Sequence, residues 1–303
     1  MTKSILLIGA GELGLAILET LLEHPSKPEI TVLLRPSSNT DLSSYGTRVR
    51  VLHGDISLSV EELAALFEEF EVIVSAIGFT SGPGSQLKLA KAVLQSQGVK
   101  KHYVPWQFGV DYDTIGRGSS QPLFDEQLDV RDLLRSQSQD QITWTIISTG
   151  LFTSFLFNPA FGVVDFHPDK KAEKTKKVTV TALGSWDNKL TITSAENIGL
   201  FTNRILLDHS EPEEGVIFVG DDTVTFGTLA QVLEEKGWQV EKRLATVEEL
   251  ENDLRQNTED VGARYKLVWA RGRGVAWDLD ECWNKRNRVE TGGVAEWIER
   301  NLK

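Results

Sequence analysis

The sequence predicts an α/β fold, in which a doubly wound parallel sheet is followed by a smaller α+β region. In the first 150 residues, six short runs of β-branched and apolar residues alternate with amphipathic helical patterns, as is typical of parallel sheets. The first run opens directly into a glycine-rich turn, and beyond Gly150 the alternation stops. We therefore expect a domain boundary near residue 150 of this 303-residue chain.

The first predicted strand, residues 4–8, leads into the pattern G-x-G-x-x-G. In a dinucleotide-binding unit the first glycine permits a tight turn, the second lets the backbone approach a pyrophosphate, and the third lets the helix pack on the sheet. The N-terminus of the following helix offers N–H groups and a positive dipole end to phosphates. The turn therefore predicts cofactor contacts at Gly9, Gly11, Glu12, Leu13 and Gly14.

A helical pattern up to Pro25 and a strand over residues 30–34 complete a βαβ unit. At the end of such a second strand, an NAD-binding unit usually places an acidic residue for the ribose 2′-hydroxyl. This chain has Arg35 there, followed by Ser37 and Ser38. A guanidinium and two hydroxyls suit a 2′-phosphate through charge-assisted hydrogen bonds. The sequence therefore favours NADP(H) as the cofactor.

The next strands are predicted over residues 49–53, 72–76, 102–105 and 143–147, with helices over 59–70, 86–97 and 124–135. The first of these helices begins with a capping box at Ser59 and Glu62. Ligands of open parallel sheets bind beyond the carboxyl ends of the strands. We therefore predict further cofactor contacts at Asp55, Ile56, Ala76, Ile77, Gly78, Pro105, Gln107 and Phe108.

The region after Gly150 begins with an apolar and aromatic run over residues 151–157, which suits a buried hinge or a pocket wall. A lysine-rich stretch over 167–177 predicts an exposed loop that is able to attract an anionic ligand. Candidate substrate contacts here are Phe152, Phe155 and Trp186. The remaining elements are a hairpin of 178–182 and 189–193, helices over 194–207, 226–236, from Thr246 and over 294–302, and strands over 216–219 and 240–244.

The composition is that of an ordinary globular protein with a net charge of -12, divided equally between the two halves. Such acidity argues against nucleic acid as a partner, because phosphate binding needs a basic face. No apolar run reaches the roughly 20 residues of a membrane span, and no leader-like segment opens the chain. Cys282 is the only cysteine, which excludes an internal disulfide. We expect a cytoplasmic protein without membrane partners.

Several common catalytic patterns are missing from the sequence. None of the four tyrosines has a lysine four residues later, so the Tyr-x-x-x-Lys pair of short-chain dehydrogenases is not present. The five histidines are scattered without metal-ligand spacing, and no G-x-S-x-G motif occurs. We expect neither a metal site nor a serine nucleophile.

Three segments together resemble the NmrA-like and isoflavone reductase-like atypical short-chain dehydrogenases/reductases, which include the phenylcoumaran benzylic ether reductases. They are residues 98–111, 124–131 and the aromatic run from Phe152. The resemblance spans nearly the whole chain. It implies a Rossmann domain over 1–150 that holds NADP(H), and a substrate-binding region over 151–303 in which the chain is able to return to the sheet. It also implies hydride transfer to a phenolic or other aromatic small molecule, and we expect an aromatic or polyketide-type substrate.

Two positions depart from the family pattern. In Phe-x-x-Lys-x-x-Val/Ile-Arg the family lysine lies beside the nicotinamide as acid/base, and here Gln127 replaces it. An amide exchanges no proton at neutral pH, although it is able to orient a carbonyl or phenol by hydrogen bonding. The family's Pro-Ser-Glu-Phe-Gly is also changed, so that Trp106 suits either stacking on an aromatic substrate or core packing. Asp111 and Tyr112 are candidate substitute proton donors.

These features predict an NADPH-dependent reductase of secondary metabolism, with Gln127, Tyr112 and Asp111 in its catalytic site. The missing lysine leaves two alternatives open. One is an NADP(H)-sensing regulator that docks a partner protein without turnover. The other is a non-redox isomerase or dehydratase that uses the cofactor as a scaffold. We expect a small aromatic molecule as the binding partner, and either a monomer or a homodimer.

Overall fold

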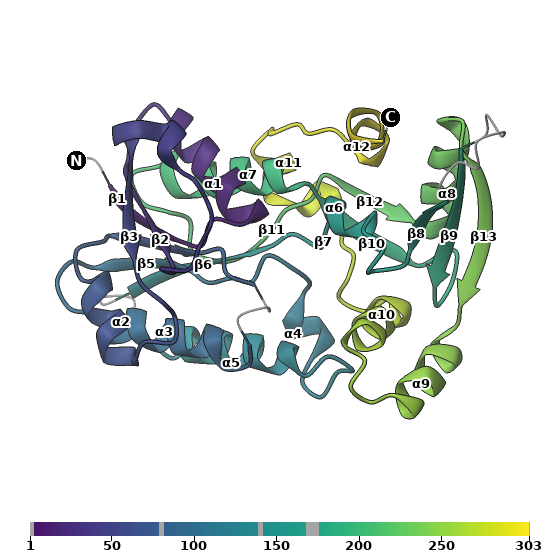
Figure 1. Ribbon diagram of the computed structural model, residues 1–303, viewed down its shortest axis with the longest axis horizontal. Coiled ribbons are helices and arrows are strands. Elements are labelled where there is room, and N and C mark those ends of the chain that lie inside the picture. Colours follow the sequence, from purple (N-terminus) through teal and green to yellow (C-terminus); the bar gives the residue numbers. More distant parts are fainter. Residues whose placement is uncertain (1–2, 79–81, 139–141, 168–175, 303) are drawn as a thin grey trace. The chain divides into compact units, whose positions relative to one another are not determined.

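The computed structural model describes residues 3–78, 82–138, 142–167 and 176–302 (Figure 1). These residues form two compact units, each assembled from separate stretches of the chain. The first unit draws on Met1–Phe108, Asp125–Ile147 and Ala195–Ile217, and the second on Gly109–Phe124, Ser148–Ser194 and Phe218–Lys303.

Within the described residues, the first unit contains a seven-stranded sheet with the strand order β11-β6-β5-β4-β1-β2-β3. Strands β1 to β6 pair in parallel, and most of their apolar side chains are buried because helices cover the sheet, whereas Val51 on the edge strand β3 is exposed. The six strands predicted for this part are confirmed, each end within one residue. They are β1 (Ser4–Ile8), β2 (Glu29–Leu34), β3 (Val49–His53), β4 (Val72–Ser75), β5 (Lys101–Val104) and β6 (Ile142–Ser148), and β11 is Gly215–Phe218.

Helices lie on both faces of this sheet (Figure 1). α1 and α7 pack together on one face, whereas α2 and α3 pack together on the other. The predicted capping box of α2 is confirmed, because Ser59 Oγ accepts the Glu62 N–H at 3.2 Å and the Glu62 carboxylate accepts the Ser59 N–H at 2.8 Å. The helices are α1 (Glu12–Glu23), α2 (Val60–Phe67), α3 (Ser85–Gln95), α5 (Leu123–Arg135) and α7 (Ala195–Leu207), and a short 3-10 helix, η1, spans Ser43–Arg48.

α7 brings a late part of the chain back to the first helix. A Cβ on Gly199 would lie 2.4 Å from the carbonyl oxygen of Ala16, so only glycine allows the two helices to approach this closely. Thr20 Oγ1 donates a hydrogen bond to the carbonyl oxygen of Gly199 at 2.9 Å, and Asn203 Nδ2 donates to that of Thr20 at 2.6 Å. The packing of α1 therefore depends on residues about 180 positions away in sequence.

His102 lies buried on β5. Its Nδ1 is 2.8 Å from Thr143 Oγ1 and its Nε2 is 2.9 Å from Thr145 Oγ1, so hydroxyls on the neighbouring strand meet both ring nitrogens. Burial lowers the pKa of His102 to about 3, and the charges of Lys3 and Lys100 add to this shift. The imidazole is therefore neutral at physiological pH.

In the second unit, the described residues form two three-stranded sheets, β12-β10-β7 and β13-β9-β8. The predicted hairpin of 178–182 with 189–193 is wrong, because β9 pairs with β8 and β13 while β10 pairs with β7 and β12. Asn188 explains the divergence, since its Nδ2 bonds the carbonyl oxygens of Leu183 and Ala270 and turns the chain from one sheet to the other. The strands are β7 (Leu151–Phe152), β8 (Val164–His167), β9 (Lys177–Leu183), β10 (Lys189–Thr193), β12 (Asp222–Thr225) and β13 (Gln239–Ala245).

The three helices predicted after residue 220 are confirmed, and further elements lie between them. The predicted helices correspond to α8 (Phe226–Glu235), α9 (Val247–Gln256) and α12 (Val294–Asn301). Elements that the sequence patterns did not indicate are β7, β8, β12, α4 (Tyr112–Ile115), α6 (Thr153–Leu156), α10 (Val261–Arg271), η3 (Leu279–Glu281) and α11 (Trp283–Arg286).

Much of the lysine-rich stretch predicted as an exposed loop, residues 168–175, lies outside the described residues. At its end, the Lys176 ammonium lies 5.2 Å from the centroid of a Trp238 ring, and Lys177 begins β9. Across the described residues, no helix combines the length and the apolar character that crossing a membrane requires.

Candidate functional site

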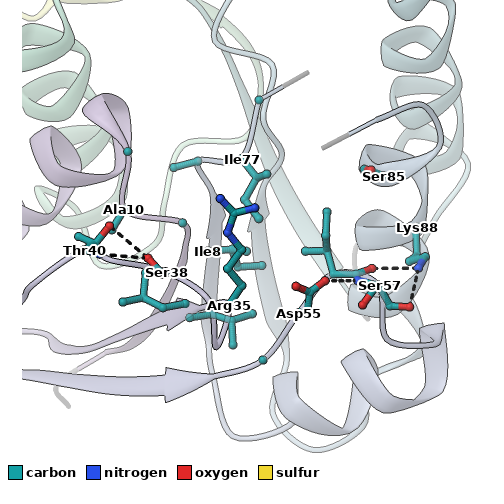
Figure 2. Close-up of a pocket in the computed structure, with 18 of the residues that line it drawn as sticks. Ile8, Ala10, Arg35, Ser38, Thr40, Asp55, Ser57, Ile77, Ser85 and Lys88 are labelled. Carbon is teal, nitrogen blue, oxygen red and sulfur yellow. Dashed lines mark hydrogen bonds between the residues drawn. The ribbon is translucent and has the colours of Figure 1, made fainter. Parts of the chain in front are cut away.

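The first unit has a pocket of about 1020 Å³ at the carboxyl ends of β1 to β4 (Figure 2). The loops that follow these strands form its walls, together with the start of α3. Among the predicted cofactor contacts, those that line it are Gly9, Gly11, Arg35, Ser38, Asp55, Ile56, Ala76, Ile77 and Gly78.

The three glycines of the turn have different local surroundings. Gly9 has φ +96°, a left-handed conformation that favours glycine, and its N–H donates to the carbonyl oxygen of Leu33 at 3.1 Å. A Cβ on Gly14 would lie 2.2 Å from the carbonyl oxygen of Gly9. Apart from Gly11 and its two chain neighbours, no described atom lies within 4 Å of the place where a Cβ on Gly11 would be. Gly14 is thus needed for packing, whereas Gly11 keeps space open in the pocket.

α1 presents its N-terminus to this space. Gly11 is the N-cap residue and has no side chain to accept the N–H groups of the first turn. The backbone dipole places partial positive charge at the same end. The turn is therefore able to hold an anionic group such as a pyrophosphate.

Arg35 follows β2 and points into the pocket, with Ser38 and Thr40 on one side and Asp55 on the other (Figure 2). The Ser38 N–H donates to the carbonyl oxygen of Arg35 at 2.9 Å, and Ser38 Oγ donates to Thr40 Oγ1 at 3.2 Å. Hydrogen bonding from the Ser57 N–H lowers the pKa of Asp55, and the charges of Arg35 and Lys88 contribute less. A guanidinium, two hydroxyls and the open turn at Gly11 fit a dinucleotide that carries an extra phosphate.

Seven predicted cofactor residues do not line this pocket. Leu13 and Gly14 are buried in α1, while Glu12 and Ser37 are exposed. The segment after β5 is also buried, and there Gln107 joins a hydrogen-bonded group described next. The full set is Glu12, Leu13, Gly14, Ser37, Pro105, Gln107 and Phe108.

Gln127, the residue at the position of the family lysine, is buried on α5. Its amide Nε2 and Oε1 have no hydrogen-bond partner among the described residues. Its carbonyl oxygen accepts a 2.9 Å hydrogen bond from Gln107 Nε2, and Gln107 Oε1 accepts a 2.8 Å bond from Arg131 Nε. The backbone at Gln127 is therefore fixed, while its side-chain amide is buried, lacks a partner among the described residues and does not line the pocket.

Trp106 precedes Gln107 in the segment after β5. The ring of Trp106 comes within 3.1 Å of the position that a Cβ on Gly78 would take, and Gly78 lines the pocket. The indole therefore packs directly against the backbone after β4.

The other candidate residues belong to the second unit. Asp111 accepts the Thr114 N–H at 3.2 Å as the N-cap of α4, and Tyr112 is buried with its ring edge-on to Phe124 at 5.0 Å. Phe155 packs with Phe161, their ring centroids 5.0 Å apart. Phe152 and Trp186 are half-buried.

Several pocket residues were not predicted. They are Thr40, Ser57, Gly84, Ser85 and Lys88, together with Ile8, Ala10, Leu33, Leu34, Gly54 and Pro83. A local signal existed for Thr40, because it continues the hydroxyl-rich run after Arg35. The sequence around Lys88 carries no signal of a pocket residue, because a lysine inside an amphipathic helix normally indicates a solvated face. Within the described ranges, no group of three or more His, Cys, Asp or Glu residues is placed to hold a metal ion.

The chain is similar to known proteins over most of its length. Residues 1–270 match the NmrA-like family. An NmrA-like family domain-containing oxidoreductase from Gibberella moniliformis is 38% identical, over 99% of this chain and 98% of that protein. Among solved structures, AtPrR2 with NADP+ and (+)-pinoresinol has a TM-score of 0.75 at 19% identity, covering 100% of this chain and 99% of that one. An isoflavone reductase has a TM-score of 0.76 at 18% identity, covering 100% of both chains.

The structural likeness establishes the Rossmann-type fold predicted above. The family assignment rests on the sequence matches, which run along most of the chain. On these grounds the chain belongs to the NmrA-like family.

Proposed function

We propose that this protein is an NADPH-dependent reductase of an aromatic or polyketide-type small molecule. The observation that carries the proposal is the pocket at the strand ends, which the open turn at Gly11 and the guanidinium of Arg35 both line. The Gibberella relative is named an oxidoreductase, and AtPrR2 was solved with NADP+ and (+)-pinoresinol. Both support the same class of reaction for this chain.

In this proposal, Arg35, Ser38 and Thr40 hold the 2′-phosphate, and the first turn of α1 binds the pyrophosphate. Gly11 leaves room for that contact. The reduced cofactor, when bound, supplies the hydride. The chain's own residues then have to bind and orient the acceptor and exclude water.

Gln127 supports one class of acceptor. Its buried amide offers one donor group and one acceptor group without partners among the described residues, which suits a ligand with a carbonyl or phenol. It has no proton to exchange at neutral pH. We therefore infer that the substrate, which accepts the hydride, yields a stabilised anion on reduction. A quinone, a quinone methide or a conjugated enone meets this condition. Such an anion takes its proton from solvent, while Asp111 and Tyr112 stay alternative donors.

The aromatic side chains complete the proposal. Trp106, packed against Gly78 at the pocket, is the residue that we assign to stacking on the substrate. Phe152, Phe155 and Trp186 stay sequence-based predictions of substrate contact. The secondary-metabolism role follows only from the class of substrate proposed.

Gln127 also favours a second candidate, an NADP(H)-sensing regulator without turnover, because the residue lacks the acid/base chemistry of lysine. A cofactor-scaffolded isomerase or dehydratase is a third. The regulator should bind NADP+ and NADPH equally well, whereas the isomerase or dehydratase should convert its substrate without consuming NADPH.

Fluorescence titration of the purified protein with NADPH, followed by absorbance assays with aromatic enones, aldehydes and quinones, tests these candidates. The reductase predicts NADPH binding and oxidation with at least one acceptor class. Tight and equal binding of NADPH and NADP+, without oxidation across the panel, would favour the regulator. The variant Gln127→Lys adds a second test, because a large gain of activity would show that the natural protein does not use the family's acid/base chemistry.

A further inference from the structure

The first turn of α3 is bonded to three other parts of the first unit. Its backbone is bound by α5, and two of its side chains bind the loops that follow β3 and β4. Both loops line the pocket. This turn therefore connects otherwise separate walls of the pocket.

Glu126 fixes the turn itself. Its carboxylate accepts hydrogen bonds from the N–H groups of Gly84 at 2.8 Å, Gln86 at 2.8 Å and Leu87 at 3.0 Å. A carboxylate at a helix N-terminus is stabilised by these N–H groups and by the helix dipole. The N-terminus of α3 is thus already occupied by an anion of the protein, unlike that of α1.

Gln86 fixes the loop after β4. Its Nε2 donates a 2.7 Å hydrogen bond to the carbonyl oxygen of Ile77, and Ile77 lines the pocket. The Oε1 of the same amide is buried and has no partner among the described residues. Among the described residues, the side-chain amide of Gln86 therefore makes one hydrogen bond, the one to Ile77.

Lys88 fixes the loop after β3. Its ammonium donates to the carbonyl oxygen of Ile56 at 2.9 Å and lies 3.4 Å from that of Ser57 (Figure 2). It also donates to the carbonyl oxygen of Leu58 at 3.0 Å. The same loop carries Asp55, whose Oδ1 accepts the Ser57 N–H. Lys88 thus holds the short loop that presents Asp55 to the pocket.

The two loops lie on opposite sides of β1 in the strand order β4-β1-β2-β3. In open sheets of this type a dinucleotide straddles the first strand. Arg35, at the end of β2, marks the side of the 2′-phosphoadenosine half, so the loop after β3 belongs to that half. The loop after β4 belongs to the nicotinamide half.

We propose that the first turn of α3 positions both halves of the dinucleotide pocket. Lys88 positions the adenosine-side loop, Gln86 positions the nicotinamide-side loop, and Glu126 positions the turn. These are positioning residues that act through backbone carbonyl and N–H groups. The proposal rests on the proposed NADP(H) function.

The assignment of Lys88 to the adenosine half and Gln86 to the nicotinamide half is tested by calorimetric titration of the full-length protein. The two ligands are NADPH and 2′,5′-ADP, which lacks the nicotinamide half. Loss of a hydrogen bond that fixes a loop should raise a Kd about 5- to 10-fold. Lys88→Met should weaken both ligands, whereas Gln86→Met should weaken NADPH and leave the Kd of 2′,5′-ADP within about twofold. Glu126→Gln should weaken both.

Lys91→Met and Gln95→Met are matched controls, because both residues are exposed on the same helix. They should leave both affinities unchanged. Thermal unfolding of each variant separates an effect on stability from an effect on binding. Gln86→Met should fold, because methionine keeps the length of the glutamine side chain and removes an oxygen that has no partner among the described residues.

Equal effects of Lys88→Met and Gln86→Met on the two ligands would overturn the division between the halves. Unchanged affinities in all three variants, with normal binding by the wild-type protein, would overturn the positioning role alone. A wild-type protein that binds neither ligand would overturn the proposed function and this proposal with it.

Discussion

The buried guanidinium of Arg131 donates a 2.8 Å hydrogen bond through Nε to Oε1 of Gln107, which is itself fully buried. Gln107 Nε2 in turn donates to the carbonyl oxygen of Gln127 at 2.9 Å. One amide therefore ties the segment after β5 to two successive turns of α5. A carboxylate at position 107 would lack the donor for the second bond.

We expect Gln107→Met to lower the free energy of unfolding by about 2–4 kcal/mol, because it removes an acceptor from the buried Arg131 and a donor from Gln127. Urea unfolding followed by circular dichroism measures this. Gln97→Met, at an exposed position, is the control. A loss no larger than that of the control would mean that the pair does not stabilise the fold.

Gln127→Met should have the opposite effect on stability. It removes two buried polar atoms without partners among the described residues, so we expect the ligand-free protein to gain about 1–2 kcal/mol. The same variant should lose catalytic efficiency towards any acceptor that the wild-type protein reduces. A lower stability in urea would contradict the view that the amide is kept for a ligand.

Arg35→Asp should reverse the preference between the two cofactors. The wild-type protein should favour NADPH over NADH by about 10- to 100-fold, which corresponds to the loss of one or two charge-assisted hydrogen bonds. The carboxylate would repel the 2′-phosphate and suit the ribose hydroxyl instead. Kd values for NADPH and NADH check this, and retained NADPH selectivity would exclude Arg35 from the 2′-phosphate site.

Gly11→Ala and Gly14→Ala should separate binding from folding. At Gly11 a methyl group meets no described atom within 4 Å beyond the neighbouring residues in the chain, so folding should be unchanged while NADPH binding weakens at least about 10-fold. At Gly14 the Cβ would lie 2.2 Å from the Gly9 carbonyl oxygen, and we expect a loss of at least about 2 kcal/mol. Thermal unfolding and NADPH titration of both variants decide this, and similar melting temperatures would refute it.

His102 should make the protein less stable in acid. Because burial lowers its folded pKa from 6.5 to about 3, the unfolded chain alone binds a proton between these values. Stability should therefore fall as the pH drops below about 6.5, with this residue contributing up to about 1.4 kcal/mol per pH unit. His102→Gln should reduce the slope of unfolding free energy against pH between 6.5 and 4, and an unchanged slope would show that His102 does not cause it.

The parallel sheet was predictable because each strand and each cap is a local pattern, as at Ser59 with Glu62. Pairing in the second unit was not predictable in this way. The run 184–188 has the composition of a hairpin turn, yet Asn188 bonds Ala270, a residue 82 positions away. Within the site, the glycines and Arg35 could be found from their order along the chain. Lys88 and Glu126 could not, because their roles depend on which loops lie beside two helices.

The contact between Gly199 and Ala16 has a consequence for how such a protein evolves. The helix that carries the glycine turn is completed by a helix encoded almost two hundred codons later. The first unit is continuous in space but drawn from three separate stretches of the chain, and residues 1–150 alone lack the helix against which α1 packs. A substitution on either side of this contact therefore has to be matched on the other, because a side chain at position 199 would meet the backbone of Ala16.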